Sequence, residues 1–139
     1  MTQLSGAKIS FILLVEDNST FRKSLKEMLA LRFPGLEFEE ASNGEEALQK
    51  LKNICPDLVF MDIRLPGKNG LEVTKMIREA KTDVEVVILT SYDIPEYRSA
   101  ALSSGASHFF VKGSSGSDEI ANCVKSILQR KGKDPAFLH

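Results

Sequence analysis

The stretch PDLVFMD, residues 56–62, decides the fold of this chain. Its apolar centre, residues 59–61, has the length of a short buried strand, and Pro56 marks the start of that strand. Asp62 stands where the strand ends, and the turn-rich residues 63–70 follow it. Ligands and chemistry are placed at the carboxyl ends of strands in α/β proteins, so Asp62 is the first candidate functional residue. The plain alternative is that Asp62 only caps the turn that follows it.

The composition is that of an ordinary globular protein. A chain of 139 residues fits one domain with a substantial core, and 42% hydrophobic with 27% charged residues is typical of that class. The formal net charge of -1, from 18 basic and 19 acidic residues, excludes a general attraction for polyanions. Cys55 and Cys123 form neither a CxxC motif nor a metal-ligand spacing, which indicates free thiols in a reducing compartment.

The sequence gives no indication of a membrane span or a secretion signal. The longest apolar run, residues 11–15, is far too short to cross a bilayer. Acidic residues follow this run where a signal peptide would have a cleavage site. We therefore expect a cytoplasmic protein without membrane contact, with residues 1–8 as a flexible leader, 9–131 as the folded domain and 132–139 as a tail or the start of a linker.

Strand and helix patterns alternate five times along the chain. The predicted strands are short apolar or β-branched runs: residues 9–15, 36–39, 56–62, 84–90 and 107–111. Between them, apolar residues recur at helical spacing and form inward-facing stripes. These stripes are Phe21, Leu25, Met28 and Leu29; Ala47, Leu51 and Ile54; Val73, Ile77 and Ala80; and Ile120, Val124, Ile127 and Leu128.

Two of the helices have clear end signals. Ser42 and Glu45 offer a capping box to the second helix. Pro95 can occupy the first turn of a short fourth helix, and Gly105 can close that helix because glycine adopts the left-handed conformation at low cost.

Strict alternation of strands and helices predicts a doubly wound α/β fold, a five-stranded parallel sheet with five helices on its two faces. The continuous apolar runs 9–15, 56–62 and 84–90 belong in the middle of the sheet. The second strand alternates apolar and acidic residues and the fifth is short, so both belong at the edges. The strand order 2-1-3-4-5 satisfies these conditions. It places the switch point, where such sheets bind ligands, between strands 1 and 3.

Three carboxylates then converge at the switch point. Glu16 and Asp17 follow the first strand directly, and Asp62 follows the third. Clustered carboxylates raise one another's pKa unless a cation joins them, and sites built from oxygen ligands suit Mg²⁺. The sequence therefore predicts a Mg²⁺ site, although Glu16 or Asp17 alone could simply cap a helix.

Two further polar residues end the neighbouring strands. Thr90 ends the fourth strand and Lys112 follows the fifth. A hydroxyl and an ammonium beside a metal and a central carboxylate can transfer a phosphoryl group, because the cations neutralise its oxygens while the carboxylate attacks in line. Thr90 could instead be a simple strand residue and Lys112 a solvated lysine. The functional interpretation is favoured because all five residues fall at one edge of the sheet: Glu16, Asp17, Asp62, Thr90 and Lys112.

In these motifs the chain resembles the response-regulator receiver domains of two-component signalling, over roughly residues 8–131. The matching motifs, in this order and spacing, are LVEDN (14–18), PDLVFMD (56–62), LPGKNG (65–70), LTS (89–91) and FFVK (109–112). The resemblance implies a flavodoxin-like fold of the chemotaxis-regulator type, Mg²⁺ as cofactor and a role as a phosphorylated switch.

The resemblance also implies roles for the site residues. Asp62 would be the phosphoacceptor, and Thr90 and Lys112 would hold the phosphoryl oxygens. Phe109, where many members carry tyrosine, would turn inward on activation, and phosphorylation would bias both Thr90 and Phe109 between two arrangements. The implied metal ligands are Glu16 through the water shell, Asp17, Asp62 and the Arg64 backbone carbonyl. The partner-facing candidates around the fourth helix are Tyr92, Tyr97, Arg98 and Ala101.

The loop after Lys112 departs from the family pattern, because Gly113 stands where proline is common. A cis bond before a residue other than proline costs about 2.5–4 kcal/mol, whereas glycine reaches positive φ cheaply. We expect a trans Lys112–Gly113 bond, a mobile loop after it, and Lys112 pointing toward Asp62.

The resemblance also implies a role for Arg64 and Tyr92. They would occupy positions that vary in the family and tune phosphoryl lifetime.

The resemblance implies partners as well as chemistry. The phosphoryl donor would be a sensor histidine kinase or a phosphotransfer protein. The output would pass to an effector protein or a C-terminal effector domain, and a phosphorylation-dependent homodimer is a further expectation. A receiver catalyses only its own phosphorylation and dephosphorylation, so it is not an enzyme in the usual sense. The alternative is a Mg²⁺-dependent phosphatase with an aspartate nucleophile, but that class carries a second aspartate at the position of Arg64.

Direct nucleic-acid binding by this chain is not expected. The basic residues of the C-terminal helix match its dipole, and aromatic residues are not interleaved with them as in a nucleic-acid site. These basic residues are Lys125, Arg130, Lys131 and Lys133. His108 is more simply a packed or solvated histidine than a phosphorelay residue.

Overall fold

The computed structural model describes residues 10–81 and 83–133. Within these residues five strands alternate with five helices. The elements are β1 (Phe11–Val15), α1 (Ser19–Arg32), β2 (Glu37–Ala41), α2 (Gly44–Leu51), β3 (Leu58–Met61), α3 (Gly70–Ala80), β4 (Glu85–Thr90), α4 (Pro95–Ser104), β5 (His108–Val111) and α5 (Ser117–Arg130). The predicted leader, residues 1–8, the first residue of the predicted first strand, and tail residues 134–139 lie outside the described residues.

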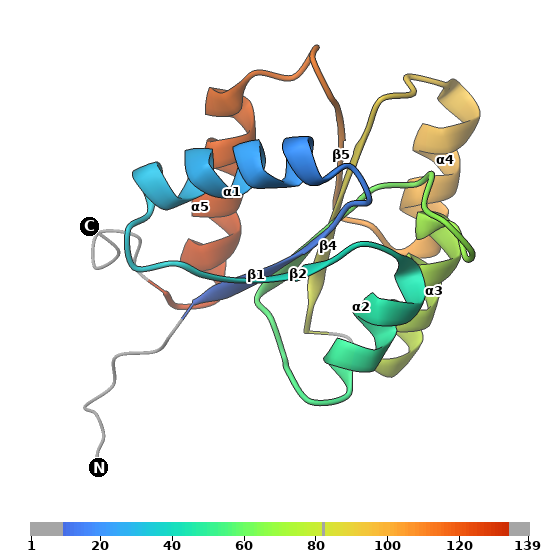
Figure 1. Ribbon diagram of the computed structural model, residues 1–139, viewed down its shortest axis with the longest axis horizontal. Helices are drawn as coiled ribbons and strands as arrows, with labels where there is room; N and C mark the ends of the chain where they lie inside the picture. The colour runs from blue at the N-terminus through green and yellow to red at the C-terminus, as the bar shows by residue number, and fades with distance from the viewer. Residues whose placement is uncertain (1–9, 82, 134–139) are drawn as a thin grey trace.

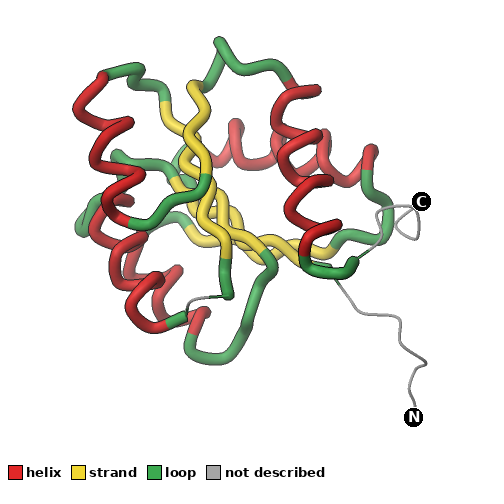
Figure 2. Tube along the Cα trace, turned by 180° about the vertical axis from the view of Figure 1, so that it is seen from behind, coloured by secondary structure: helices red, strands yellow, loops and turns green. Residues whose placement is uncertain are grey.

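The five strands form one parallel sheet in the order β2-β1-β3-β4-β5, which confirms the predicted topology. Helices α1 and α5 cover one face of this sheet, and α2, α3 and α4 cover the other (Figure 1). Figure 2 shows the same two groups of helices from behind, with the strands between them.

Burial follows this layering. Every residue of β3 is buried, as are four of the five residues of β1, because each strand packs against helices on both sides. In the edge strand β2, by contrast, Glu37 and Glu39 are exposed and Phe38 is half-buried. The contrast confirms that apolar continuity separates central strands from edge strands in this chain.

The second helix begins one residue later than predicted. The side chain of Asn43, not Ser42, caps α2 by accepting a 2.8 Å hydrogen bond from the Glu46 amide. The Glu46 carboxylate in turn accepts from the Ser42 amide at 2.8 Å. Helix α2 then ends at Leu51, so Ile54 packs against the core from the following loop.

The ends of the fourth helix follow the prediction. Pro95 occupies its first turn, and Gly105 ends it in the left-handed conformation with φ of 104°. Across the two described segments, none of the helices is both long and apolar enough to cross a membrane.

Candidate functional site

The predicted carboxylates meet at the carboxyl ends of β1 and β3. One oxygen from each of Glu16, Asp17 and Asp62 lies within 4.8 Å of the others. Glu16 is only 5% exposed and Asp62 only 7%, whereas Asp17 is exposed. The predicted convergence of three carboxylates is therefore confirmed.

Backbone hydrogen bonds continue the strand pairing up to these residues and fix their positions. The Asp62 amide donates to the Val15 carbonyl at 3.1 Å, and the Glu16 amide donates to the Ala41 carbonyl at 2.9 Å. The carboxylate of Glu16 also accepts the Asn18 amide at 3.0 Å. Glu16 and Asp62 thus stand directly at the ends of paired strands, whereas Asp17 lies in the bend between β1 and α1.

The ammonium of Lys112 lies among the buried acids. Its Nζ atom is 2.5 Å from Oε1 of Glu16 and 3.0 Å from Oδ2 of Asp62, and it lies 4.5 Å from the ring centroid of Phe21. All described peptide bonds are trans, and Gly113 adopts a positive φ of 82°. The trans bond after Lys112, the glycine turn and the direction of the lysine side chain are confirmed. The mobility of the following loop stays a prediction.

Burial and hydrogen bonding set the charges of this cluster. Burial raises the pKa of Glu16 above its ordinary value, and the hydrogen bonds from Lys112 and the Asn18 amide offset this only in part. Burial alone would lower the pKa of Lys112, but its hydrogen bonds to Glu16 and Asp62 outweigh burial and raise that pKa. Lys112 is therefore a fixed positive charge at neutral pH.

The donor set fits Mg²⁺. Three carboxylates against one ammonium leave a formal excess of two negative charges (three minus one), which a divalent cation would neutralise. The ligand atoms are all oxygens, the ligand type that Mg²⁺ prefers, and the exposure of Asp17 leaves room for water.

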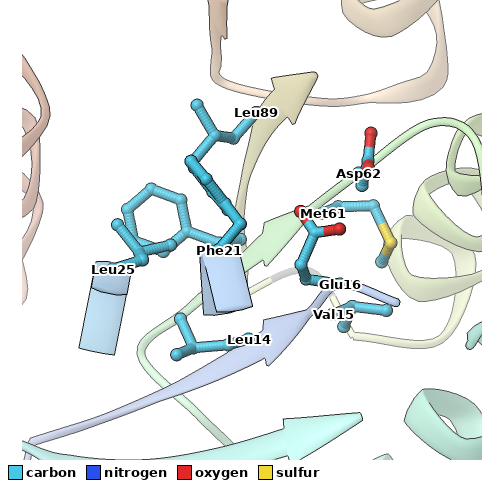
Figure 3. A pocket seen from close by; sticks show the side chains of 9 residues that line it. Leu14, Val15, Glu16, Phe21, Leu25, Met61, Asp62 and Leu89 are labelled. Carbon is cyan, nitrogen blue, oxygen red and sulfur yellow. The ribbon is translucent and has the colours of Figure 1, made fainter. Parts of the chain in front are cut away.

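A small pocket lies beside the acids, between α1 and the sheet (Figure 3). The carboxylates of Glu16 and Asp62 stand on one side of it, and the side chains of Phe21, Leu25 and Leu89 stand on the other. The cluster is thus bounded by apolar side chains on the side of the core. Electrostatic interactions are stronger beside such a low-dielectric surface than in water.

Thr90 and Phe109 lie on the adjoining strands. Thr90 is fully buried at the end of β4, and its Oγ1 atom has no hydrogen-bond partner among the described residues. Phe109 is half-buried on β5, and the guanidinium of Arg98 lies 4.7 Å from its ring centroid. A buried hydroxyl without a hydrogen-bond partner is energetically costly, which makes Thr90 a candidate to bond a group that enters the site.

The prediction of four partner-facing residues is wrong for one of them, Ala101. Tyr92 and Arg98 are exposed and Tyr97 is half-buried, but Ala101 is fully buried. Ala101 belongs to the core cluster that packs α3 and α4 against the sheet, so it faces inward.

The arginine that follows Asp62 by two residues makes contacts that sequence reasoning missed. The guanidinium of Arg64 lies 3.8 Å from the ring centroid of Tyr92, and its Nε atom donates a 3.3 Å hydrogen bond to the Tyr97 hydroxyl. The side chain thus joins the loop after Asp62 to the loop after β4 and to α4. The only sign of this contact in the sequence was that Arg64 and Tyr92 each stand two residues past a predicted site residue, Asp62 and Thr90.

The basic residues at the end of α5 are engaged within the protein. Arg130 lies 3.7 Å from a Glu85 carboxylate oxygen, Lys131 donates to the Asp83 carbonyl, and Lys133 lies 2.8 Å from Oδ1 of Asp57. Lys125, the fourth residue of the predicted basic cluster, is exposed on α5. His108 is half-buried and stacks against Phe110, in agreement with a packed histidine.

Comparison with known proteins agrees with this geometry. The family model of the response regulator receiver domain matches residues 12–125. The transcriptional regulatory protein LnrK of Bacillus subtilis is 36% identical over 116 residues, which cover 84% of this chain and 52% of that protein. DegU of Brevibacillus brevis is 32% identical over 130 residues, which cover 91% of this chain and 53% of that protein. The chain thus spans about half the length of these curated relatives.

Solved structures agree in fold and sequence. The response regulator TrrA of Thermotoga maritima, in complex with Mg²⁺ and BeF, is 41% identical with a TM-score of 0.75, over 86% of this chain and 99% of that one. A CheY-like receiver domain protein of Methanospirillum hungatei is 26% identical with a TM-score of 0.82, over 90% of this chain and 98% of that one. The chain therefore belongs to the response regulator receiver domain family of two-component systems.

Proposed function

We propose that the chain is a phosphoacceptor switch, in which Asp62 receives a phosphoryl group from a phosphohistidine of a sensor histidine kinase or a phosphotransfer protein. The observation that carries this proposal is the buried Asp62 carboxylate, 3.0 Å from the Lys112 ammonium and clustered with two further acids. The membership of the chain in the receiver family supports the same reaction.

The reaction is a single displacement at phosphorus. An oxygen of the Asp62 carboxylate attacks, the P–N bond of the donor phosphohistidine breaks, and the leaving imidazole keeps the electron pair and takes up a proton. Lys112 then interacts with a phosphoryl oxygen in place of the free carboxylate. The buried hydroxyl of Thr90 donates to another phosphoryl oxygen and gains the partner that it otherwise lacks.

The cation site supports this chemistry. Asp17, Asp62 and the backbone carbonyl of Arg64 would hold Mg²⁺. Glu16 would act through water, because Lys112 binds its Oε1 and the Asn18 amide binds its Oε2, whereas Lys112 binds only Oδ2 of Asp62. Bound Mg²⁺ supplies charge neutralisation for the transferred phosphoryl oxygens.

Phosphorylation of Asp62 is the test of the proposal. The wild-type chain should take up one acid-labile phosphoryl group from acetyl phosphate in the presence of Mg²⁺, and Asp62→Asn should take up none while retaining its circular dichroism spectrum. Asp57→Asn is the matched control, since it changes a buried aspartate at the opposite end of β3 and should leave labelling intact. Normal labelling of the Asp62→Asn variant would refute the assignment.

A turnover assay with small phosphate esters distinguishes the switch from a phosphatase. A switch becomes labelled once per molecule, whereas a phosphatase with an aspartate nucleophile releases phosphate from small esters over many turnovers. The sequence also disfavours a phosphatase. Two residues past Asp62 stands Arg64, which supplies no carboxylate to act as a general acid.

We propose that the switch output lies on the α4–β5–α5 side of the domain. Phosphorylation would draw Thr90 toward the phosphoryl group and let Phe109 turn inward, which changes the surface around Tyr92, Tyr97 and Arg98. Amide chemical shifts on addition of beryllofluoride should then change along α4 and β5. Shifts confined to the ends of β1 and β3 would contradict this output route.

The proposed effector and homodimer partners follow from the proposed role as a phosphoacceptor switch. We propose that residues 9–131 form the receiver unit, that it acts in the cytoplasm, and that its output passes to an effector protein or a C-terminal effector domain. The greater length of LnrK and DegU supports an effector domain in a longer form of the protein. A phosphorylation-dependent homodimer is a further proposed partner, and light scattering with and without beryllofluoride would test it.

A further inference from the structure

The side chain of Arg22, in the first turns of α1, joins the acidic loop to the edge strand. One of its terminal nitrogens, NH1, donates a 2.5 Å hydrogen bond to the backbone carbonyl of Glu16. Its Nε atom donates a 2.8 Å hydrogen bond to Oε1 of Glu40, which stands near the end of β2. Only 18% of the Arg22 side chain is exposed, so this bridge is held within the structure.

The carbonyl that Arg22 binds belongs to the peptide unit between Glu16 and Asp17. A peptide unit is planar, so fixing the direction of its carbonyl also fixes the direction in which the Asp17 Cα leaves it. Asp17 is the exposed acid of the three, whereas Glu16 and Asp62 are held by Lys112. Arg22 is therefore placed to limit the freedom of the acid that the surrounding structure restrains least.

Glu40 provides a firm anchor for Arg22. Its carboxylate also accepts a hydrogen bond from Lys26 at 3.1 Å, and its backbone carbonyl accepts one from Lys50 at 2.5 Å. Hydrogen bonds that involve charged groups are roughly twice as strong as neutral ones. The bridge thus ties the acidic loop to α1, β2 and α2 together.

We propose that Arg22 is a positioning residue for the cation site: through the Glu16 carbonyl it holds the peptide that presents Asp17. This inference rests on the proposed function, because it assumes that Asp17 takes part in binding a divalent cation. Positioning of a cation ligand is a role that the proposed function gives to none of the five residues at the strand ends: Glu16, Asp17, Asp62, Thr90 and Lys112.

The sign of the effect separates positioning from simple electrostatics. If Arg22 acted only through its positive charge, removing that charge would strengthen the binding of a cation. If Arg22 positions Asp17, removing it weakens cation binding, as does the loss of partners that orient the ligands in other metal sites.

The experiment is a Mg²⁺ titration of the full chain without any phosphoryl donor, followed by amide chemical shifts, with urea unfolding measured in parallel. The variants are Arg22→Met, Glu40→Gln, Asp17→Asn and the control Arg32→Met. Arg32 lies on the same helix and forms an ion pair with Asp118 at 2.6 Å, so its replacement removes an equivalent charge away from the acids.

We expect Arg22→Met to raise the Mg²⁺ Kd by about tenfold and Glu40→Gln to raise it by a smaller factor. Arg32→Met should leave the Kd unchanged, and Asp17→Asn should raise it most. An unchanged or lower Kd in Arg22→Met, with Asp17→Asn raised, would overturn the positioning role alone. An unchanged Kd in Asp17→Asn would overturn the proposed cation site and the inference with it. If Arg22→Met does not fold, Glu40→Gln decides, with Glu39→Gln as the charge control on the same strand. A Kd equal to that of the parent, or raised no more than in Glu39→Gln, overturns the proposal.

Discussion

The Nζ atom of Lys112 donates a 3.0 Å hydrogen bond to Oδ2 of Asp62, across 50 positions of sequence. This contact joins the end of β5 to the end of β3, with β4 between them in the sheet. The Asp62 carboxylate, the proposed phosphoacceptor, thus faces a cation before any phosphoryl group arrives. A phosphoryl group on Asp62 would present its oxygens to the same ammonium, so little rearrangement of the site is needed for the reaction.

Replacement of Lys112 by methionine should destabilise the protein most strongly in the absence of Mg²⁺. It leaves the buried carboxylates of Glu16 and Asp62 without their cation, and breaking a buried ion pair costs about 3–5 kcal/mol. Mg²⁺ should restore part of the lost free energy of unfolding, because it supplies positive charge at the same place. Urea unfolding with and without Mg²⁺ measures both effects.

Lys133→Met is the matched control for that experiment. Its ammonium lies 2.8 Å from Oδ1 of the buried Asp57, at the opposite end of β3. Its loss should also lower the free energy of unfolding, but Mg²⁺ should not restore it. Equal recovery of both variants by Mg²⁺ would show that the metal stabilises the protein elsewhere.

The Glu40 carboxylate should make stability depend on pH in the acidic range. Hydrogen bonds from Arg22 and then Lys26 hold the pKa of Glu40 below its ordinary value. A lowered folded-state pKa means that the stabilisation is present above the unfolded-state pKa and is lost as pH falls through the folded-state value. The difference in unfolding free energy between the parent and Glu40→Gln should therefore shrink from about pH 6 to about pH 3.

The same pH series in an Arg22→Met background tests the cause. Without its first partner, Glu40 should show a smaller acidic dependence, and the coupling between the two substitutions should decrease as pH falls. A coupling that stays constant over the acidic range would mean that Glu40 does not act through its charge.

The two cysteines should differ strongly in reactivity. Burial raises the pKa of the Cys123 thiol to about 11, so almost no thiolate forms at neutral pH, whereas Cys55 is exposed. Iodoacetamide should modify one thiol in the native protein and the second only after unfolding, as counted by mass spectrometry. Cys55→Ser should abolish native modification, and rapid modification of that variant would contradict the burial of Cys123.

Much of the fold could be predicted because burial on both faces leaves a direct mark on the sequence. Residues 58–61 are apolar without interruption and are all buried, and the acidic alternation of residues 37–39 marks the edge strand. Element ends were harder to predict, because one hydrogen bond decides them. The Asn43 side chain caps α2 where the Ser42–Glu45 spacing suggested a cap one residue earlier.

The acids of the site were predictable because Glu16 and Asp62 directly follow strands and Asp17 comes next after Glu16, and strand ends have a fixed place in a parallel sheet. The contacts of Arg22 with Glu40 and of Arg64 with Tyr92 were not, because they depend on how separate elements lie beside one another. A single charge on a helix gives no sign of which neighbour it will reach.

The error at Ala101 has a simpler cause. Residues four positions apart share a helix face, so Tyr97 and Ala101 lie together, and this face packs inward. Arg98 and Leu102 form the corresponding outer pair, and Leu102 is 63% exposed. Helix α4 carries few large apolar residues, so its inward face was not visible in the sequence.

Among the glycines of residues 10–81 and 83–133, Gly70 should tolerate substitution least, because of its contact with the Asp62 backbone. A Cβ at this position would lie 2.0 Å from the Asp62 carbonyl oxygen and 3.0 Å from the Ile63 Cα. Both are backbone atoms, so relief of the clash requires the start of α3 and the end of β3 to move apart. The Gly70 amide also donates a 2.8 Å hydrogen bond to the Ile63 carbonyl, and that movement would break this bond.

We therefore expect Gly70→Ala to lower the free energy of unfolding by about 3 kcal/mol, at the upper end of the usual cost of overpacking. It should also slow the labelling of Asp62 by acetyl phosphate, because the displaced backbone carries Asp62, the proposed phosphoacceptor. Gly116→Ala is the control, since its Cβ meets open space at a negative φ of -76°, and it should cost less than about 1 kcal/mol. Equal stability and equal labelling rates in the two variants would show that the backbone beside Asp62 yields easily, and that its close packing does not hold the Asp62 carboxylate in place.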